Sequence, residues 1–192
     1  MAIKPVEISK FYRLVNHGPT AMISAKHNRI ENVMSASWVC ALDFAPQAKM
    51  MIVVDKAAYT RTLIEQSGYF AVQVPTVAQA ELVLDMGESR KENPHKLDNV
   101  PLFYLENVDI PLVEGCAAWI ICRVIDEPHN QQVHDLFIGE VISAWADDQM
   151  FDNGRWKFDE LPDDLKTLHY VAGGQFYQIG KGFNLSRGPN VE

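Results

Sequence analysis

Short β-forming segments dominate this chain, and they follow one another without long helices between them. Seven runs rich in Val, Ile, Phe, Tyr and Trp are bounded by turn residues, which predicts strands at 20–25, 33–42, 50–54, 70–74, 116–125, 136–145 and 175–179. The helices expected at 59–66, 77–86 and 163–168 are too short to serve as crossovers in a parallel sheet. Because closure leaves fewer exposed edges, the sequence predicts a mainly β, closed or nearly closed barrel with short peripheral helices.

The sequence predicts a single domain. Its 192 residues, 47% of them apolar, suit a single domain with a sizeable core over residues 1–192. We find no internal repeat or linker, and expect a long ordered loop at 87–101 and a flexible tail at about 182–192. Gly139, inside a predicted strand, indicates a bend or a close backbone approach.

Composition excludes several classes of function. A net charge of -8 argues against a nucleic-acid partner, because such binding depends on basic residues that neutralise phosphates. Cys40, Cys116 and Cys122 lie in apolar runs without metal-ligand spacing, so we expect buried structural thiols and no metal site. No apolar run approaches the ~18 residues of a membrane span, and Lys4 and Glu7 interrupt any signal-peptide core. The prediction is a cytoplasmic protein without a membrane partner.

The stretch between residues 32 and 68 carries the clearest chemical signal. Ser35 and Ser37 place hydroxyl groups on an otherwise apolar strand next to Trp38, although they also fit outward-facing strand residues beside a core tryptophan. Thr60 stands just before a predicted helix, where its hydroxyl and the free amides of the first turn form an anion site. The competing interpretation of Thr60 is an ordinary helix cap. Phosphate-loop, dinucleotide-fingerprint, metalloprotease and hydrolase-elbow motifs are absent from the sequence.

Four segments carry a family resemblance through their order and spacing. The first is Asn32-Val33-Met34-Ser35-Ala36-Ser37-Trp38, similar to an Asn-x-Met-Thr/Ser-x-Ser-Trp motif, and it precedes Ala45-Pro46, where Pro-Pro is usual. The second runs from Tyr59-Thr60 to Gly68-Tyr69-Phe70-Ala71-Val72-Gln73-Val74, with Gln73 in place of Asn. The third is Ser89-Arg90 followed by Lys96-Leu97, with His95 in place of Asp. The fourth is His134-Asp135-Leu136-Phe137-Ile138-Gly139-Glu140-Val141, preceded by Gln132-Val133 where Gly-Asp is usual.

Together these segments resemble the flavin reductase-like, FMN-binding split-barrel family, particularly its flavoredoxin-like branch, over roughly residues 15–180. The resemblance implies a Greek-key split barrel that binds FMN. Basic and hydroxyl side chains near the predicted helix would hold the phosphate, and His134 would lie beside the reactive ring, unless it is a surface or structural histidine. The candidate cofactor-binding residues are Met34, Ser35, Ala36, Ser37, Trp38, Lys56, Tyr59, Thr60, Arg61, Ser89, Arg90, Lys96 and His134. Tyr170 matches a terminal family segment and is expected to pack in the core.

The implied activity is hydride transfer from NADH or NADPH to the flavin, with electrons passed on to free flavin, a partner oxygenase, a redox protein or a small oxidant. The cofactor carries this chemistry, so no acid or base side chain is obligatory, and His134 is the only candidate. The resemblance also implies a homodimer that buries each flavin partly between its subunits. Two alternatives stay open. One is an FMN-binding electron carrier or sensor that makes no direct use of NAD(P)H, and the other is a split barrel that binds haem or no cofactor.

Overall fold

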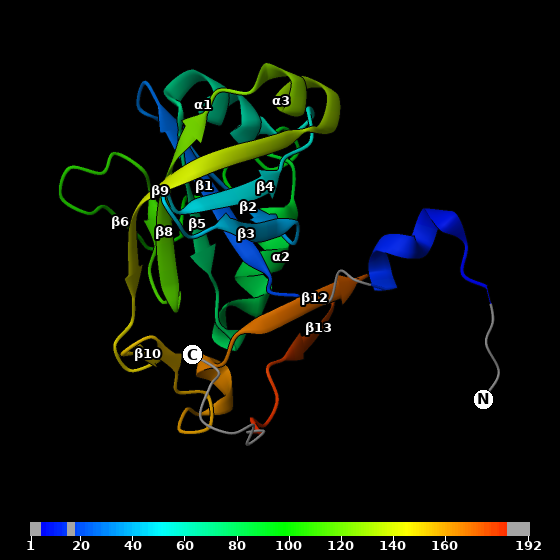
Figure 1. Cartoon of the computed structure of the whole chain (residues 1–192), viewed down its shortest axis with the longest axis vertical. Coiled ribbons are helices and arrows are strands. Elements are labelled where there is room, and N and C mark those ends of the chain that lie inside the picture. Colours follow the sequence, from blue (N-terminus) through cyan, green and yellow to red (C-terminus); the bar gives the residue numbers. More distant parts are fainter. Residues whose placement is uncertain (1–4, 15–17, 184–192) are drawn as a thin grey trace.

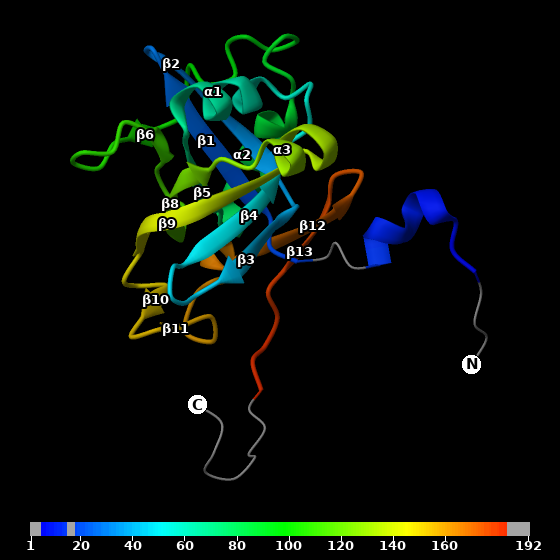
Figure 2. The same cartoon turned by 45° about the horizontal axis from the view of Figure 1, so that its top comes forward.

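The structure is a computed structural model that describes residues 5–14 and 18–183. Most of the predicted tail, residues 184–192, therefore lies outside the described residues. Figures 1 and 2 show one twisted sheet with helices around it and two hairpins at one end. None of the described helices is long and apolar enough to cross a membrane.

One antiparallel sheet forms the body of the molecule, and its two edges are neighbours in sequence. The strands lie in the order β2-β1-β5-β8-β9-β4-β3. They are β1 (Ala21–His27), β2 (Ile30–Ala36), β3 (Val39–Asp43), β4 (Lys49–Val53), β5 (Tyr69–Val74), β8 (Ala118–Ile125) and β9 (Leu136–Ala146). Only Ser37 and Trp38 separate the edge strands β2 and β3, so the edges of the sheet meet at that corner. This arrangement confirms the mainly β, nearly closed barrel.

Short helices and hairpins surround the sheet. The helices are α1 (Tyr59–Ser67), α2 (Ala80–Gly87) and α3 (Pro128–His134), with 3-10 turns η1 (Ile8–Leu14), η2 (Val77–Gln79) and η3 (Asp163–Leu165). Three small antiparallel pairs complete the described part: β6 (Leu102–Phe103) with β7 (Leu112–Val113), β10 (Phe151–Asp152) with β11 (Arg155–Trp156), and β12 (Leu168–Ala172) with β13 (Gln175–Gln178). The loop predicted at 87–101 follows α2 and contains turns only.

Strand β1 is buried on both faces, and this places α1 and α2 on opposite sides of it. Because successive side chains alternate across a strand, Ile23 packs with Ile64 of α1 in the barrel core, while Met22 packs with Met86 of α2. Burying such a side chain contributes about 1.5–3 kcal/mol, so the two helices are held firmly against β1 and its neighbour β2. The N-terminal end of α1 and the C-terminal end of α2 thereby lie close together near the middle of β2.

Some expectations change in the structure. The strand predicted at 33–42 breaks at Ser37 and Trp38, because the chain crosses there from one edge of the sheet to the other. The helix predicted at 163–168 is only the turn η3, and Leu168 begins β12. Helix α3 and turn η1 were not expected. The sequence analysis also did not predict the short strands β6, β7, β10, β11 and β12.

The structure also tests what the sequence predicted for Gly139 and for the three cysteines. A Cβ on Gly139 would lie 2.6 Å from the Phe70 ring and 2.7 Å from the Cβ of Cys122, which confirms the close approach. Cys116 and Cys122 are buried, and burial raises the pKa of each thiol to about 12, so both act as apolar packing groups. Cys40 is exposed on β3, so the expectation of burial was wrong there.

Candidate functional site

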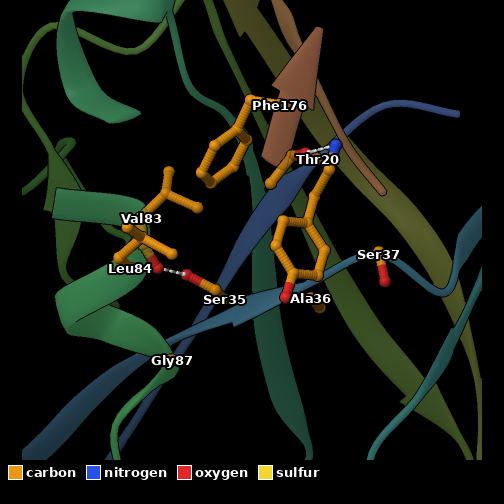
Figure 3. A pocket seen from close by; sticks show the side chains of 9 residues that line it. Thr20, Ser35, Ala36, Ser37, Val83, Leu84, Gly87 and Phe176 are labelled. Atoms are coloured by element: carbon orange, nitrogen blue, oxygen red, sulfur yellow. Dashed lines mark hydrogen bonds between the residues drawn. The ribbon is translucent and has the colours of Figure 1, made fainter. Parts of the chain in front are cut away.

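Two adjoining cavities lie along β2. The first, here the loop cavity, has a volume of about 270 Å³ and is lined by Asn32, Met34, Ser35, Asp55, Ala57, Ala58, Tyr59, Thr60, Met86, Gly87, Glu88, Ser89, Arg90 and Lys96. The second, here the hairpin cavity, has a volume of about 200 Å³ and is lined by Thr20, Ser35, Ala36, Ser37, Val83, Leu84, Gly87, Tyr170 and Phe176 (Figure 3). Ser35 and Gly87 line both, so the two cavities are neighbours. Nine of the thirteen candidate residues named from the sequence line one or both of them.

The first turn of α1 opens toward the loop cavity. Ala58 is the N-cap residue and makes no side-chain cap hydrogen bond. Thr60 is therefore the second residue of the helix and does not stand before it as expected, and the competing interpretation of Thr60 as the helix cap is wrong. Thr60 is fully buried, and its Oγ1 accepts a hydrogen bond from Asn32 Nδ2 at 2.8 Å. Because the hydroxyl accepts from Asn32, its own proton stays available for an acceptor in the cavity. The unpaired amides of a first helical turn favour the same kind of ligand, an anion.

Arg90 enters the loop cavity from the loop that follows α2. Its Nη1 donates to the Glu31 carbonyl and, at 3.4 Å, to Asn32 Oδ1. The guanidinium carbon lies 5.3 Å from the centre of the Tyr59 ring, within the range of a cation–π contact. Among the described residues these hydrogen bonds use Nη1 alone, so the edge formed by Nε and Nη2 can take a planar or tetrahedral oxyanion.

Lys96 places a second positive charge in the wall of this cavity. The residue is 8% exposed, and its Nζ donates to the Met86 carbonyl at 3.0 Å and the Glu88 carbonyl at 2.9 Å. Burial, together with the nearby charge of Arg90, lowers the pKa of Lys96 to about 8, while the charge of Glu88 acts in the opposite direction. Within the described part of the chain, Lys96 forms no ion pair with a carboxylate. A buried ammonium group in this situation is stabilised by an anionic ligand.

The hairpin cavity is more apolar. Val83 and Leu84 of α2 form one side, and Phe176 of the β12–β13 hairpin faces them in Figure 3. The Tyr170 ring packs 5.2 Å from the Phe176 ring, so this half-buried tyrosine lines the cavity rather than the core. Ser35 Oγ donates to the Val83 carbonyl and ties β2 to α2. An apolar slot that leads into a cationic cavity suits a ligand with a flat apolar part and an anionic part.

Four candidates lie outside both cavities. Arg61 is 4% exposed, and its guanidinium donates to the Val54 carbonyl at 2.9 Å, the Gln131 carbonyl at 2.6 Å and the Asp135 carboxylate at 2.5 Å. These partners belong to the fold, so Arg61 fastens α3 to the end of β4 and does not face the cavities.

The other three outlying candidates are exposed. Lys56 donates to the Gln132 carbonyl at 2.7 Å. His134 ends α3, with its ring edge-on to His129 at 5.5 Å, and Trp38 is 48% exposed at the corner between β2 and β3. The structure therefore does not bring Lys56, Trp38 or His134 into the lining of either cavity.

Asn32 is the most connected of the site residues that the sequence reasoning missed. It is 2% exposed on β2, donates to Thr60 and accepts from Arg90, and so connects two cavity residues that are 30 positions apart in the chain. Its signal was available, because Asn32 opens the family motif and is the one amide side chain in it. Val83, Leu84 and Phe176 were missed for a different reason, since apolar residues at helical or strand spacing are typical of a core.

A nearly closed antiparallel barrel with a cationic cavity beside an apolar slot is a split barrel with a candidate ligand site. The family model described as "Flavin reductase like domain" matches residues 13–178, and the chain belongs to this family. This chain is similar to an FMN-binding domain of a flavin reductases-like enzyme from Shewanella baltica, which is known from a crystal structure. The two sequences are 54% identical, and the structures align with a TM-score of 0.85 over 94% of this chain and 96% of that one. These findings confirm the family and the fold expected from the sequence.

Two further relatives are more distant. The Escherichia coli protein YddH is 37% identical over 182 residues, which cover 92% of this chain and 95% of that protein. Flavoredoxin from Methanosarcina acetivorans is 20% identical, with a TM-score of 0.70 over 88% of each chain, and shows likeness of fold alone.

Proposed function

We propose that this protein binds FMN and works as a flavin reductase-like oxidoreductase. The cofactor phosphate lies in the loop cavity and the flavin ring extends toward the hairpin cavity. The observation that carries the proposal is Lys96, a buried ammonium without a carboxylate partner in the described chain, which shares one cavity with Arg90 and the start of α1.

The residues of the loop cavity fit a phosphate monoester. Thr60 offers a hydroxyl proton, Arg90 offers the Nε and Nη2 edge, and Lys96 offers a charge that is poorly compensated without an anion. Ser89 stands exposed at the same rim. Charge-assisted hydrogen bonds contribute about 1.5–3 kcal/mol each, so two of them would favour FMN over riboflavin by a few kcal/mol.

The segment from Ser35 to Ser37 supports the proposed ring position. Ala36 and Ser37 line the hairpin cavity with small side chains, so the chain presents its backbone amide and carbonyl groups beside an apolar wall. Such an arrangement satisfies the polar edge of a flat heterocycle while its faces stay in apolar surroundings. When bound, FMN would supply the redox chemistry by taking a hydride from NADH or NADPH and passing electrons to an acceptor.

The second candidate is an FMN-binding electron carrier or sensor that never uses a pyridine nucleotide directly. The observation that favours it is the segment before His134, where Gln132 and Val133 continue helix α3 and leave His134 exposed outside both cavities. In the reductase, His134 would lie on the path of the nicotinamide. The two candidates predict different reactions with the nucleotide.

We infer that the working unit is a homodimer. Strand β3 and the residues on either side of it expose apolar side chains: Trp38 before it and Leu42 within it are each 48% exposed, and Phe44 after it is 92% exposed. Trp38 directly follows Ser37, which lines the hairpin cavity. Covering this surface with a second copy would shield the ring of the cofactor from water. We expect about 43 kDa, twice 21.7 kDa, in light scattering at low micromolar concentration, whereas a monomer loaded with flavin would contradict the inference.

The experiment that tests the function begins with the absorbance spectrum of freshly purified protein. Flavin bands support the proposal, and haem bands or an empty protein that does not take up added FMN would contradict it. Anaerobic stopped-flow mixing of the FMN-loaded protein with NADH or NADPH then separates the candidates. Rapid bleaching indicates a reductase, and an unreduced flavin indicates a carrier or sensor.

A further inference from the structure

The position of Arg90 in the loop cavity depends on a hydrogen bond to a residue that does not line the cavity. Arg90 is held by the main-chain carbonyl of Glu31, close to the turn between β1 and β2. Strand β2 is an edge strand in the described sheet, so only β1 pairs with it along the ladder. The carbonyl that holds Arg90 therefore lies on the free side of a strand end, where the sheet alone fixes it weakly.

A second set of contacts fixes this strand end. Tyr104, in the segment between β6 and β7, donates its hydroxyl to Glu31 Oε2. Lys26, which pairs directly with Glu31 across the β1–β2 ladder, lies 4.4 Å from the centre of the Tyr104 ring and forms an ion pair with Asp109 at 2.6 Å. Burial and the bond to Glu31 raise the pKa of Tyr104 to about 12, so its hydroxyl keeps its proton and acts as the donor.

We propose that Tyr104 and the Glu31 side chain are positioning residues for the phosphate site, acting through Arg90. They line none of the loop cavity themselves. They set the position of the Glu31 carbonyl, which orients the guanidinium so that its Nε and Nη2 edge faces the anion. The inference rests on the proposed function, because it assigns Arg90 to the phosphate of FMN.

The test is a double-mutant cycle read out by the dissociation constants of FMN and riboflavin, measured by quenching of flavin fluorescence. Tyr104→Phe removes one hydroxyl group and should weaken FMN roughly three- to tenfold while leaving riboflavin unchanged. In an Arg90→Ala background the same substitution should have no further effect, since the group it positions is gone. Tyr69→Phe is the matched control, because Tyr69 is 39% exposed, close to the 42% of Tyr104, and should change neither affinity.

Each contrary result has one meaning. If Tyr104→Phe weakens FMN and riboflavin equally, or lowers the melting temperature together with both affinities, Tyr104 is structural and the positioning role is wrong. If the loss for FMN persists in the Arg90→Ala background, the effect does not pass through Arg90 and the inference is overturned. If Arg90→Ala leaves the ratio of FMN to riboflavin affinity unchanged, the phosphate site itself is misplaced and the proposed function fails at its first step.

Discussion

FMN binding should weaken as the pH rises through the pKa of Lys96. Burial and the charge of Arg90 lower that pKa from 10.5 to about 8 in the protein without ligand, which corresponds to roughly 3 kcal/mol of unfavourable charge. A phosphate in the loop cavity favours the charged ammonium, so binding raises the pKa back toward its ordinary value. Above pH 8, FMN binding must therefore be accompanied by proton uptake at Lys96.

The size of the effect follows from these two pKa values. If the phosphate restores a value near 10.5, the FMN association constant falls roughly 30-fold between pH 7 and pH 9.5, or about 2 kcal/mol. The phosphate is already largely a dianion at pH 7, so its own ionisation adds little to this change. Titrations of flavin fluorescence at several pH values would measure the dependence.

Two comparisons isolate Lys96 as the cause. Riboflavin lacks the phosphate, so its affinity should stay flat over the same pH range. Lys96→Arg keeps the charge at every pH used and should remove most of the pH dependence of FMN binding. An equal pH dependence for FMN and riboflavin, or an FMN dependence that survives in Lys96→Arg, would refute this reasoning.

Three further predictions concern residues placed by the structure. Arg61→Ala removes a buried guanidinium and its ion pair with the partly buried Asp135, and should lower the free energy of unfolding by about 3 kcal/mol in urea titrations, with the ratio of FMN to riboflavin affinity unchanged. A selective loss of FMN at normal stability would instead place Arg61 in the site. Gly139→Ala pushes a methyl group into Phe70 and Cys122 and should cost about 1–3 kcal/mol in the same assay, so an unaltered midpoint would contradict the close approach. The structure places His134 outside both cavities, so His134→Ala should slow flavin reduction at saturating nucleotide in stopped flow, with FMN retained and little change in melting temperature, only if the protein is the reductase and the nicotinamide passes α3. An unchanged reduction rate would remove His134 from the nucleotide path.

Local sequence patterns predicted most of the elements because each strand carries its own signal. Six β-branched and aromatic runs bounded by turn residues cover the seven strands of the main sheet, with β2 and β3 predicted as a single strand. The motif at 32–38 and the helix at 59–66 are confirmed as neighbouring elements. The break at Ser37 and Trp38 escaped prediction. It depends on the closure of the barrel, which brings two edges together, and no short window of sequence records closure.

The candidate site was predictable where residues act within one motif. Met34, Ser35, Thr60 and Arg90 were named from the sequence, and all four line the loop cavity. Asn32 was not, since its role requires Thr60 and Arg90 to be brought beside it from other elements.

The contrast between two arginines shows what sequence alone determines. The sequence established a mainly β chain, its family, and a cluster of hydroxyl and basic groups around one helix start. It could not tell which arginine faces the cavity, because Arg61 stands beside Thr60 in the chain and is the more obvious phosphate ligand. Tertiary structure decided this, since α3 and its C-terminal end bring the Gln131 carbonyl and Asp135 to Arg61, while the loop after α2 brings Arg90 to β2. Periodicity encodes which face of an element is buried, but the partner of a long charged side chain is set by contacts that span 59 to 74 positions of the chain.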